Sequence, residues 1–505
     1  MIRRTLLAAC AIVAGIAAAP PPAAAQHLRI GLAEDPDILD PTLARTFVGR
    51  IVFAALCDKL FDIDAKLSIV PQLATGYEWA SPTALVIRLR AGVKFHDGEA
   101  LDAEAVKYSL ERHLSMQGSF RRSEINSMER VEVVDPLTVR IVLKEPFAPF
   151  VAQLTDRAGM IVSPKAAQAA GAQFGNRPVC AGPFRFVERV AQDRIVVEKF
   201  DGYWDAANIH LARITYQPIP DATVRLANLQ AGALDLIERV DTNDVAAVQR
   251  NRALAHTTVA SLGYTGITIN VGNGAQANTP LGRDARVREA FDLAIDREAL
   301  NQVVNSGLFS ITAQAVPPAS PYHVAAIPAP KRNLERARAL LREAGVRQPV
   351  PVVLTVPNSP VNRQTGEVIQ AMAAEAGFDV KLSAMEFASS LQAAARGEFE
   401  AYFIGWSGRT DPDGNLWAFV HSRGAQNDGR YSNAEADRLL DAARVENDVE
   451  KRRALYEAMD RIILLQDRPR LYLWHPTWIV AHTTRLSGWV PNPDGLVRLQ
   501  GLRLN

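Results

Sequence analysis

The sequence predicts an α/β protein of at least two domains, and three observations carry this prediction. The chain has 505 residues, which is more than a single hydrophobic core usually supports. Helix and strand patterns alternate through its second half, as in parallel βαβ units with right-handed crossovers. Apolar residues make up 48% of the chain, a share that excludes intrinsic disorder.

The beginning of the chain predicts a secretory signal peptide. Two arginines precede an apolar run over residues 6–19, and three alanines that end at Ala25 fit a small-residue cleavage site. The apolar run is shorter than the roughly 20 residues that span a bilayer. We expect residues 1–25 to be removed, which leaves a soluble protein outside the cytoplasm. Lipidation at Cys10 is the alternative, but it leaves a very short apolar region before that cysteine.

Two cysteines, Cys57 and Cys180, remain once the signal peptide is removed. An even number in an oxidising compartment permits one disulfide, and two buried thiols are the alternative. Neither cysteine belongs to a CxxC pair, so we expect no metal-binding or redox role for them.

Charge and motif content exclude several partners. The formal net charge is +1, or −1 without the two arginines of the signal peptide, which is unlike a nucleic-acid-binding protein. The nine histidines form no HxxxH or HxH pair. Asp411, Asp413 and Asn415 begin like a calcium loop, but the required glycine comes too early, at Gly414. The chain also lacks a P-loop and a dinucleotide fingerprint, so we expect no metal and no cofactor.

The first half of the chain is predicted to be rich in short strands. Asp102 is placed to cap a helix over residues 103–113. Asp221 caps a second helix, which ends near Gln230 before Gly232. The strands are predicted over 28–32, 84–89, 138–143 and 234–237.

Helices and strands alternate in the second half. Asn333 caps a helix whose apolar residues recur at helical spacing before Gly345. Two further helices end at Gly377 and Gly397, and a strand follows each glycine directly. These two helices are predicted over 364–376 and 389–396, and the strands over 350–356, 378–382 and 399–404.

The chain ends with two helices and two strands. Ser432 begins a capping box, Ser432 to Glu435, ahead of one helix. Asp448 caps the next helix, whose apolar stripe is typical of a surface that faces a core. That helix must end before Pro469. The strands are predicted over 471–474 and 477–481.

Several short segments, spread over nearly the whole mature chain, resemble the family of periplasmic dipeptide-, oligopeptide- and nickel-binding proteins of ABC importers. Each segment is weak alone, and their common order and spacing make the resemblance specific. The segments are VKFHDGE (93–99), AGPF (181–184), DGYW (201–204), RVREA (286–290) running into AIDRE (294–298), and GW (405–406) with DPD (411–413) close behind.

The resemblance implies a type II periplasmic binding-protein fold, in which two lobes joined by a hinge enclose a ligand cleft. Lobe I is expected to comprise residues 27–264 and 477–505, with a strand-rich subdomain at about 70–200, and lobe II residues 265–476. The resemblance also implies a periplasmic monomer that captures a small-molecule ligand and delivers it to the permease subunits of an ABC transporter.

The segment after the predicted strand 399–404 is the first candidate for ligand contact. Ligands of open parallel sheets bind beyond the carboxyl ends of the strands, where Gly405, Trp406 and Ser407 follow. The glycine lets a ligand approach the backbone closely. Trp406 offers a flat apolar wall, and a core tryptophan is the alternative for it. The family resemblance selects the same segment.

Arg409 is the next candidate. Peptide-binding members of the family have an aspartate three residues after this tryptophan, and it pairs with the amino terminus of the peptide. A guanidinium at this position suits an anionic ligand, because arginine presents a planar fork to carboxylate or phosphate. Asp411 is a further candidate contact, and an internal salt bridge from Arg409 to Asp411 or Asp413 is the alternative.

Arg45, Thr46 and Phe47 resemble the family's N-terminal strip of ligand contacts. The resemblance implies that Arg45 faces the cleft from the lobe opposite to Arg409. We therefore expect a peptide-like or acidic organic solute, with peptides, opine-like conjugates, sugar phosphates and other organic acids all left open.

A secreted serine esterase is the rival interpretation. Residues 405–409 almost form a G-x-S-x-G nucleophile elbow around Ser407, and His475 lies downstream. Arg409 replaces the last glycine, and residues 411–414 predict a turn in place of the helix that an elbow requires. We therefore expect a binding protein without catalytic residues. A sensory receptor of the same fold is a further alternative.

Overall fold

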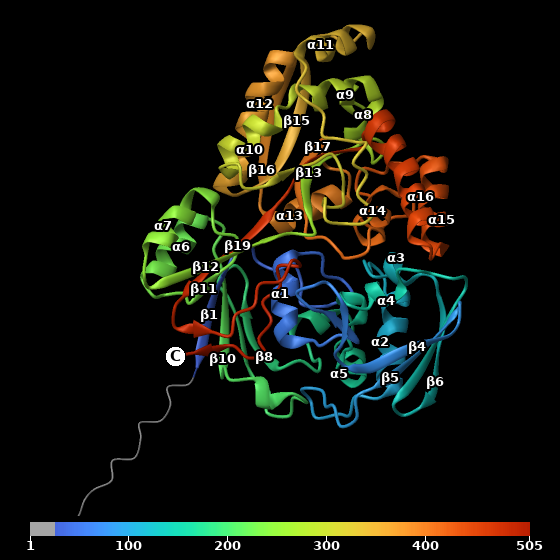
Figure 1. Ribbon diagram of the computed structural model, residues 1–505, viewed down its shortest axis with the longest axis vertical. Helices are drawn as coiled ribbons and strands as arrows, with labels where there is room; N and C mark the ends of the chain where they lie inside the picture. Colours follow the sequence, from blue (N-terminus) through green and yellow to red (C-terminus); the bar gives the residue numbers. More distant parts are fainter. Residues whose placement is uncertain (1–25) are drawn as a thin grey trace, which may run out of the picture.

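A computed structural model describes residues 26–505, which form two lobes that lie one above the other in Figure 1. Each lobe is built on its own central sheet. The predicted signal peptide, its cleavage near Ala25 and the alternative lipidation at Cys10 lie outside the described residues. Within residues 26–505, every helix is too short or too polar to cross a membrane.

Lobe I is built on a seven-stranded sheet in the order β12-β19-β11-β1-β10-β9-β8. Strand β1 lies parallel to β10 and β11, and the other neighbours are antiparallel. One strand, β19, comes from near the end of the chain. The strands are β1 (His27–Leu32), β8 (Phe184–Val190), β9 (Arg194–Lys199), β10 (Arg213–Pro218), β11 (Leu236–Ile237), β12 (Leu254–Ala260) and β19 (Thr477–Thr483).

A four-stranded antiparallel sheet, β4-β5-β7-β6, forms a separate body beside the main sheet of lobe I (Figure 1). Its strands are β4 (Ala74–Ser81), β5 (Ala84–Leu89), β6 (Met128–Asp135) and β7 (Thr138–Leu143). Two small sheets pair β2 (Phe61–Ile63) with β3 (Ile69–Pro71) and β20 (Leu486–Ser487) with β21 (Arg503–Leu504). The helices of lobe I are α1 (Phe47–Leu56), α2 (Ala103–Ser115), α3 (Arg122–Ile125), α4 (Phe150–Gln153), α5 (Pro164–Ala170), α6 (Ala222–Gln230) and α7 (Val245–Arg250).

Lobe II is built on a six-stranded sheet in the order β14-β18-β13-β17-β15-β16. Strand β15 is parallel to β16 and β17, as predicted, but β13 runs antiparallel to β17 and β18. The sheet is therefore mixed. Its strands are β13 (Tyr264–Ile269), β14 (Ser310–Ile311), β15 (Val350–Pro357), β16 (Phe378–Met385), β17 (Ala401–Trp406) and β18 (Arg470–His475).

The helices of lobe II cover this sheet and continue into a helical layer at its side (Figure 1). Asp448 caps the last long helix as predicted, because its side chain accepts from the backbone N–H of Lys451. The helices are α8 (Pro280–Arg283), α9 (Ala285–Ala294), α10 (Arg297–Asn305), α11 (Leu334–Glu343), α12 (Pro360–Ala376), α13 (Phe387–Ala395), α14 (Asp413–Val420), α15 (Ala434–Val445) and α16 (Val449–Ile462).

Several element boundaries differ from the sequence prediction for local reasons. Helix α12 begins four residues early, because Ser359 caps it and Pro360 is tolerated in the first turn. The predicted capping box at Ser432 is wrong, since Asn433 is the N-cap residue and accepts from two backbone N–H groups. Strand β11 is shorter than predicted, because the N–H of Leu234 closes the end of α6 on the carbonyl of Asn228.

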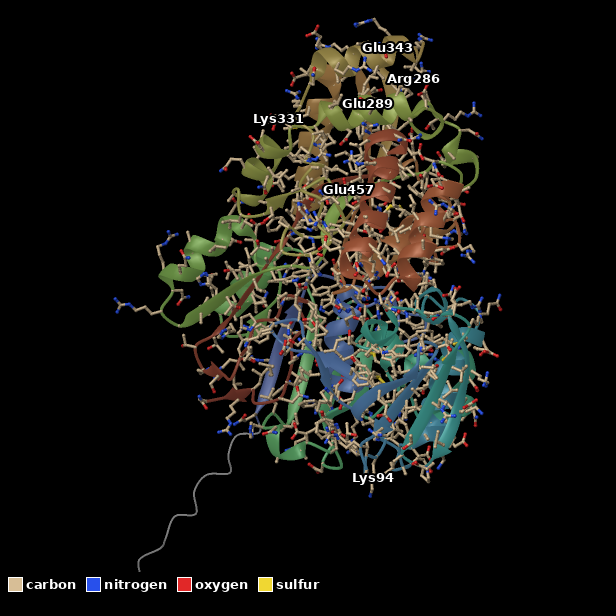
Figure 2. The ribbon with its side chains drawn as sticks, turned by 45° about the vertical axis from the view of Figure 1, so that its right-hand side comes forward. Lys94, Arg286, Glu289, Lys331, Glu343 and Glu457 are labelled. Carbon is tan, nitrogen blue, oxygen red and sulfur yellow. A yellow bond between two sulfur atoms is a disulfide. The ribbon has the colours of Figure 1, made fainter. Side chains whose placement is uncertain are left out.

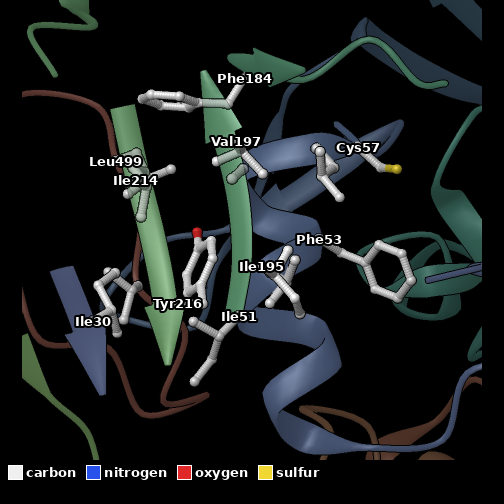
Figure 3. Packing of buried hydrophobic residues seen from close by; sticks show 14 of the residues in the cluster. Ile30, Ile51, Phe53, Cys57, Phe184, Ile195, Val197, Ile214, Tyr216 and Leu499 are labelled. Atoms are coloured by element: carbon white, nitrogen blue, oxygen red, sulfur yellow. The ribbon is translucent and has the colours of Figure 1, made fainter. Parts of the chain in front are cut away.

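The core of lobe I joins its first helix to the main sheet. Figure 3 shows Ile51 and Phe53 of α1 beside Ile195 of β9 and Tyr216 of β10. All four side chains are fully buried. The helix that carries the N-terminal candidate residues is therefore fixed rigidly to the sheet behind it.

Cys57 and Cys180 are joined by a disulfide, with their Cα atoms 4.9 Å apart. Cys57 stands at the end of α1 (Figure 3). Cys180 comes shortly before β8. The bridge connects positions 123 residues apart in sequence and lies in the core of lobe I.

The chain passes between the two central sheets twice, from β12 to β13 and from β18 to β19. The two passages are bonded side by side, since the N–H of Ser261 donates to the carbonyl of Pro476 at 3.0 Å. Gly263 lies in the first passage, where a Cβ atom would come within 1.9 Å of the carbonyl oxygen of Trp406. Only glycine fits there.

Charged side chains cover the outer ends of both lobes. Figure 2 shows Arg286 and Glu343 at the far end of lobe II and Lys94 at the opposite end of lobe I. Arg286 also donates to the backbone carbonyl of Glu343 at 2.8 Å, which ties α9 to the end of α11. The region where the lobes meet lies between these ends.

Candidate functional site

A cavity of about 530 Å³ lies between the lobes and is lined by both of them. Its volume falls in the range of about 300–1,000 Å³ that is typical of small-molecule sites. Aromatic rings and charged side chains share its walls. Lining residues from lobe I include Glu34, Arg45, Phe47, Arg239 and Trp478, and those from lobe II include Tyr264, Trp406, Ser407, Phe419, Gln426, Asp428 and Arg470.

The end of β17 places Gly405 and Trp406 on the cavity. Both residues belong to the strand, paired with Thr265 and Tyr264, so the strand runs two residues further than predicted. Trp406 donates from Nε1 to Asn415 Oδ1 at 3.0 Å and packs edge-on against Phe419, with the ring centroids 4.8 Å apart. It is thus mostly buried and also forms part of the cavity wall.

Ser407 follows the strand and also lines the cavity. Its hydroxyl accepts a hydrogen bond from Arg50 Nη1 at 3.0 Å, across the boundary between the lobes. His475 is occupied elsewhere, since its Nδ1 lies 2.6 Å from the carbonyl of Gly263. Within residues 26–505 no histidine forms a hydrogen bond with Ser407, so the structure gives no support to the esterase alternative.

The structure contradicts one of the two sequence arguments against an esterase. The sequence predicted a turn at residues 411–414, whereas helix α14 begins at Asp413. Asp411 makes the turn that precedes it, because its Oδ1 accepts from the N–H of Asp413 at 2.9 Å. A strand, a short connection and a helix therefore do follow one another here. The segment still differs from a nucleophile elbow, because Arg409 replaces the last glycine and, within residues 26–505, no histidine is bonded to Ser407.

Arg409 does not line the main cavity. Its guanidinium lies over the ring of Trp406, 4.4 Å from a ring centroid, and Nη2 is 3.2 Å from Asp156 Oδ1 in lobe I. Asp156 also pairs with Arg50 at 2.5 Å and with Arg157 at 3.2 Å. The alternative for Arg409, a salt bridge to Asp411 or Asp413, is wrong, because the partner of Arg409 comes from the other lobe.

Burial and charge shape this group of ion pairs around Asp156. Burial lowers the pKa of Arg409 to about 10, and Asp156 opposes that shift. Burial also disfavours the charged form of Asp156, but Arg409, Arg50 and Arg157 together hold the pKa of this carboxyl well below its ordinary value. Asp156 therefore acts as the anion that joins the two lobes at this point.

The two aspartates after Arg409 have structural partners of their own. Asp411 accepts two hydrogen bonds from Arg452, both at 2.7 Å. Asp413 accepts from Arg444 at 2.6 and 3.0 Å. Neither aspartate lines the main cavity, so the structure does not bring Asp411 to the site with the other candidates.

Of the three N-terminal candidates, two line the cavity and one caps a helix. Arg45 and Phe47 line the cavity, and Phe47 stacks on Trp478 with the ring centroids 4.5 Å apart. Thr46 instead caps α1, because its hydroxyl oxygen accepts from the N–H of Gly49 at 3.2 Å. Arg45 donates to Asp428 of lobe II at 2.9 Å.

Sequence reasoning missed Arg470, Gln426, Arg239 and Trp478, all of which line the cavity. A signal for Arg470 was present, because it is the only charged residue in the otherwise apolar strand RLYLWH (470–475). A charge in a buried strand needs a partner or a function. The other three residues offered no local pattern.

Within residues 26–505, no group of three or more histidine, cysteine, aspartate or glutamate side chains is arranged to hold a metal ion. The polar side chains of the cavity include arginines, carboxylates, amides and hydroxyls, which suit hydrogen bonds and ion pairs to an organic solute. A two-lobed α/β fold with a solute-sized cavity between the lobes defines the class of solute-binding proteins.

The chain belongs to family 5 of the bacterial extracellular solute-binding proteins. The family model described as "Bacterial extracellular solute-binding proteins, family 5 Middle" matches residues 68–427. The resemblance inferred from the short segments is thereby confirmed.

Relatives agree with this assignment along almost the whole chain. The glutathione-binding protein GsiB of Pectobacterium atrosepticum is 30% identical, over 98% of this chain and 97% of the relative. The structure of AgaA from A. tumefaciens in complex with agropinic acid is similar, with a TM-score of 0.86 and 26% identity over 95% of this chain and 99% of AgaA. The dipeptide-binding protein from Pseudoalteromonas, in complex with Met-Leu, has a TM-score of 0.88 at 21% identity, covers 95% of this chain and 100% of its own, and shares the fold.

Proposed function

We propose that the protein is an extracytoplasmic receptor that captures a peptide-like or acidic organic solute and delivers it to an ABC transporter permease. The observation that carries the proposal is the cavity, which draws aromatic and charged side chains from both lobes. Relatives named for glutathione binding and a neighbour bound to agropinic acid support this solute class. Both of these solutes carry carboxylates.

The mechanism is reversible capture by hinge closure. Arg45 and Asp428, Arg50 and Ser407, and Arg409 and Asp156 each join a lobe I residue to a lobe II residue. A solute in the cavity favours this enclosed arrangement to the extent that it binds it better than the open one. The permease then distinguishes the enclosed form from the open form.

The proposed ligand contacts are the candidates that line the cavity, namely Arg45, Phe47, Gly405, Trp406 and Ser407. We propose the lobe boundaries expected from the sequence, moved by one residue so that Tyr264, the first residue of β13, belongs to lobe II: residues 27–263 with 477–505, and residues 264–476. The paired passages near Ser261 and Pro476 lie where these segments join. We also propose that the mature protein is a periplasmic monomer without enzymatic activity, after cleavage near Ala25.

Identifying the solute that the protein carries tests the proposal. Protein purified without refolding is denatured, and the released small molecules are identified by mass spectrometry. The same molecules, with a panel of peptides and organic acids, are then added to solute-free protein in a thermal-shift assay. We expect at least one peptide-like or acidic solute to raise the Tm in proportion to the logarithm of its concentration. If no member of either set raises the Tm, the proposal is wrong.

The absence of enzymatic activity has its own test. Incubation with a serine-directed fluorophosphonate is expected to leave Ser407 unlabelled, because its hydroxyl accepts from Arg50 and has no histidine base. Labelling of Ser407, or turnover of the bound solute, would overturn this part of the proposal.

A further inference from the structure

Within residues 26–505, four arginines line the cavity. Two of them pair with carboxylates, and a third donates hydrogen bonds to backbone carbonyl groups. Arg45 pairs with Asp428, and Arg239 pairs with Glu34 and Glu238. The guanidinium of Arg225 donates hydrogen bonds to three backbone carbonyl groups. These carbonyls belong to Ile219, Pro220 and Arg239, at 2.6, 3.1 and 2.8 Å.

Arg470 is the exception among these arginines. Its side chain is only 7% exposed, and its one hydrogen bond within residues 26–505 runs from Nη1 to the hydroxyl of Tyr264 at 3.0 Å. No carboxylate of the described chain lies within ion-pair distance of Arg470. Burying a guanidinium without a counter-charge costs free energy. We therefore expect such a residue to have a function.

The surrounding rings hold the guanidinium without neutralising it. Its central carbon lies 4.9 Å from the ring centroid of Phe419 and 5.5 Å from that of Tyr264. The Tyr264 hydroxyl donates its proton to the carbonyl of Asn415 at 3.3 Å, which leaves its oxygen free to accept from Arg470. The aromatic contacts therefore fix the orientation of the planar guanidinium group, and its charge remains available to a ligand in the cavity.

Gln426 adds a neutral polar group to the wall of the same cavity. Its side chain is 5% exposed and lines the same cavity. Within residues 26–505 its amide group makes no hydrogen bond, whereas its backbone N–H is held by the carbonyl of Ala418 at 2.9 Å. A buried amide offers two donors and an acceptor, and these need partners.

We propose that Arg470 is the anion-binding residue of the cavity and that it binds a carboxylate of the solute, with the amide of Gln426 as a second donor. This inference rests on the proposed function and names the solute class more narrowly. The guanidinium fork matches the two oxygens of a carboxylate. The rings of Phe419 and Trp406 provide an apolar wall beside it for the body of the solute.

A carboxylate fits this site better than a phosphate dianion does. Within residues 26–505, Arg470 is the one lining arginine that has neither a carboxylate partner nor several carbonyl acceptors, and six carboxylates line the same cavity. Three of these side chains, Asp221, Asp241 and Glu386, form no ion pair within residues 26–505, and they would repel a solute whose second negative charge is not balanced by a cation of its own. The lining carboxylates are Glu34, Asp35, Asp221, Asp241, Glu386 and Asp428.

Calorimetry with matched solutes tests the assignment. The test solutes are glutathione, agropinic acid and acidic dipeptides, each as the free acid and as its carboxyl ester. Wild-type protein is expected to bind at least one acid about 10- to 100-fold more tightly than its ester, which corresponds to a lost charged hydrogen bond. Arg470→Gln is expected to weaken binding of the acid by a similar factor and to bind acid and ester alike.

The conservative variant and a matched control sharpen the test. Arg470→Lys keeps the charge without the planar fork, so we expect intermediate affinity. Arg461→Gln removes an exposed arginine of α16 that pairs with Glu457, and binding is expected to stay unchanged. If wild type binds an acid and Arg470→Gln binds it equally well, the assignment of Arg470 is wrong and the proposed function stands. If wild type binds none of the solutes, the proposed function fails.

Stability without any solute provides a second, independent measurement. Because Arg470 has no counter-charge in the solute-free protein, Arg470→Gln is expected to leave the Tm unchanged or to raise it. Arg444→Gln is the contrasting variant, since it removes the partner of Asp413 and is expected to lower the Tm by several degrees. A fall in Tm for Arg470→Gln as large as that for Arg444→Gln would show a structural role and overturn the inference.

Discussion

Arg45 of lobe I donates from Nη2 to the carboxylate of Asp428 in lobe II at 2.9 Å, at the wall of the cavity. Its Nη1 also donates to the carbonyl of Leu391 in lobe II at 3.3 Å. Burial alone would lower the pKa of Arg45, but Asp428 raises it above its ordinary value. The pair therefore joins the two lobes at the cavity wall, and in the proposed mechanism it is lost when the lobes open.

Breaking this contact is expected to weaken solute binding. Asp428→Asn removes the counter-charge of Arg45 from the enclosed form and leaves the open form unaffected, so the equilibrium shifts toward opening. We expect the affinity measured by calorimetry to fall by about tenfold. Small-angle scattering of the solute-bound variant should also show a larger share of the extended, open form.

The control for this variant is an exposed ion pair far from the cavity. Glu343→Gln removes the partner of Arg336, which lies 2.8 Å away on the surface of α11. Exposed pairs contribute little, so affinity should not change. Equal affinities for wild type and Asp428→Asn would contradict a role for the pair in closure.

Asp156 is expected to control stability in acid. Because its folded-state pKa lies below the unfolded value of about 4, its ion pairs stabilise the protein above that pH and are lost as the pH falls through the folded value. Asp156→Asn leaves three buried arginines without their common anion and should lower the free energy of unfolding at pH 7 by about 3–5 kcal/mol. Thermal unfolding from pH 7 to pH 2.5 measures both effects.

A matched exposed aspartate separates this effect from general charge loss. Asp193 pairs with Arg194 at the surface, and Asp193→Asn should leave the free energy of unfolding within about 0.5 kcal/mol of the wild-type value. The acid-induced loss of stability should be smaller in Asp156→Asn than in wild type and in Asp193→Asn. If stability falls equally with decreasing pH in all three proteins, Asp156 is not the group responsible for the loss of stability in acid.

The disulfide is expected to contribute to stability and not to binding. The double variant Cys57→Ala, Cys180→Ala opens a long loop in lobe I, and losses of about 2–5 kcal/mol are typical for such bridges. Neither cysteine lines the cavity, so solute affinity at 20 °C, well below the Tm, should be retained. Thermal unfolding and calorimetry check the two parts, and treatment of wild type with a reductant should reproduce the lower Tm.

The sequence predicted the elements whose signals are local. Asp102, Asp221, Asn333 and Asp448 each cap the helix that they were expected to cap, because an N-cap hydrogen bond reaches only two or three residues along the chain. The parallel pairing of β15 with β16 also followed from one helix between two strands.

Contacts between distant segments could not be predicted in this way. Arg409 meets Asp156 from a position 253 residues away, and no local pattern distinguishes Asp156 from other aspartates. Strand β13 was not recognised as the antiparallel neighbour of β17 and β18, because its two partners come from much later in the chain. The role of Arg470 likewise depends on Phe419 and Tyr264, which are neighbours only in the fold.

Asp460 of α16 should make the protein less stable as the pH rises. Asp460 is 3% exposed, and within residues 26–505 its carboxyl group receives no hydrogen bond. Burial, with a smaller contribution from Glu457, raises the pKa of Asp460 to about 8. The folded state therefore holds a proton that the unfolded state releases above about pH 4, so stability is lost between that pH and pH 8.

Asp460→Asn replaces the neutral acid by an uncharged group of the same shape and should remove this loss. We expect the variant to exceed wild type by about 1–3 kcal/mol at pH 8 and to differ little at pH 4. Thermal unfolding at pH 4, 6 and 8 measures the difference. Glu450→Gln, which changes a largely exposed residue of the same helix, is the control and should follow wild type. If the difference in the free energy of unfolding between Asp460→Asn and wild type does not grow with pH, Asp460 is already ionised in the folded protein.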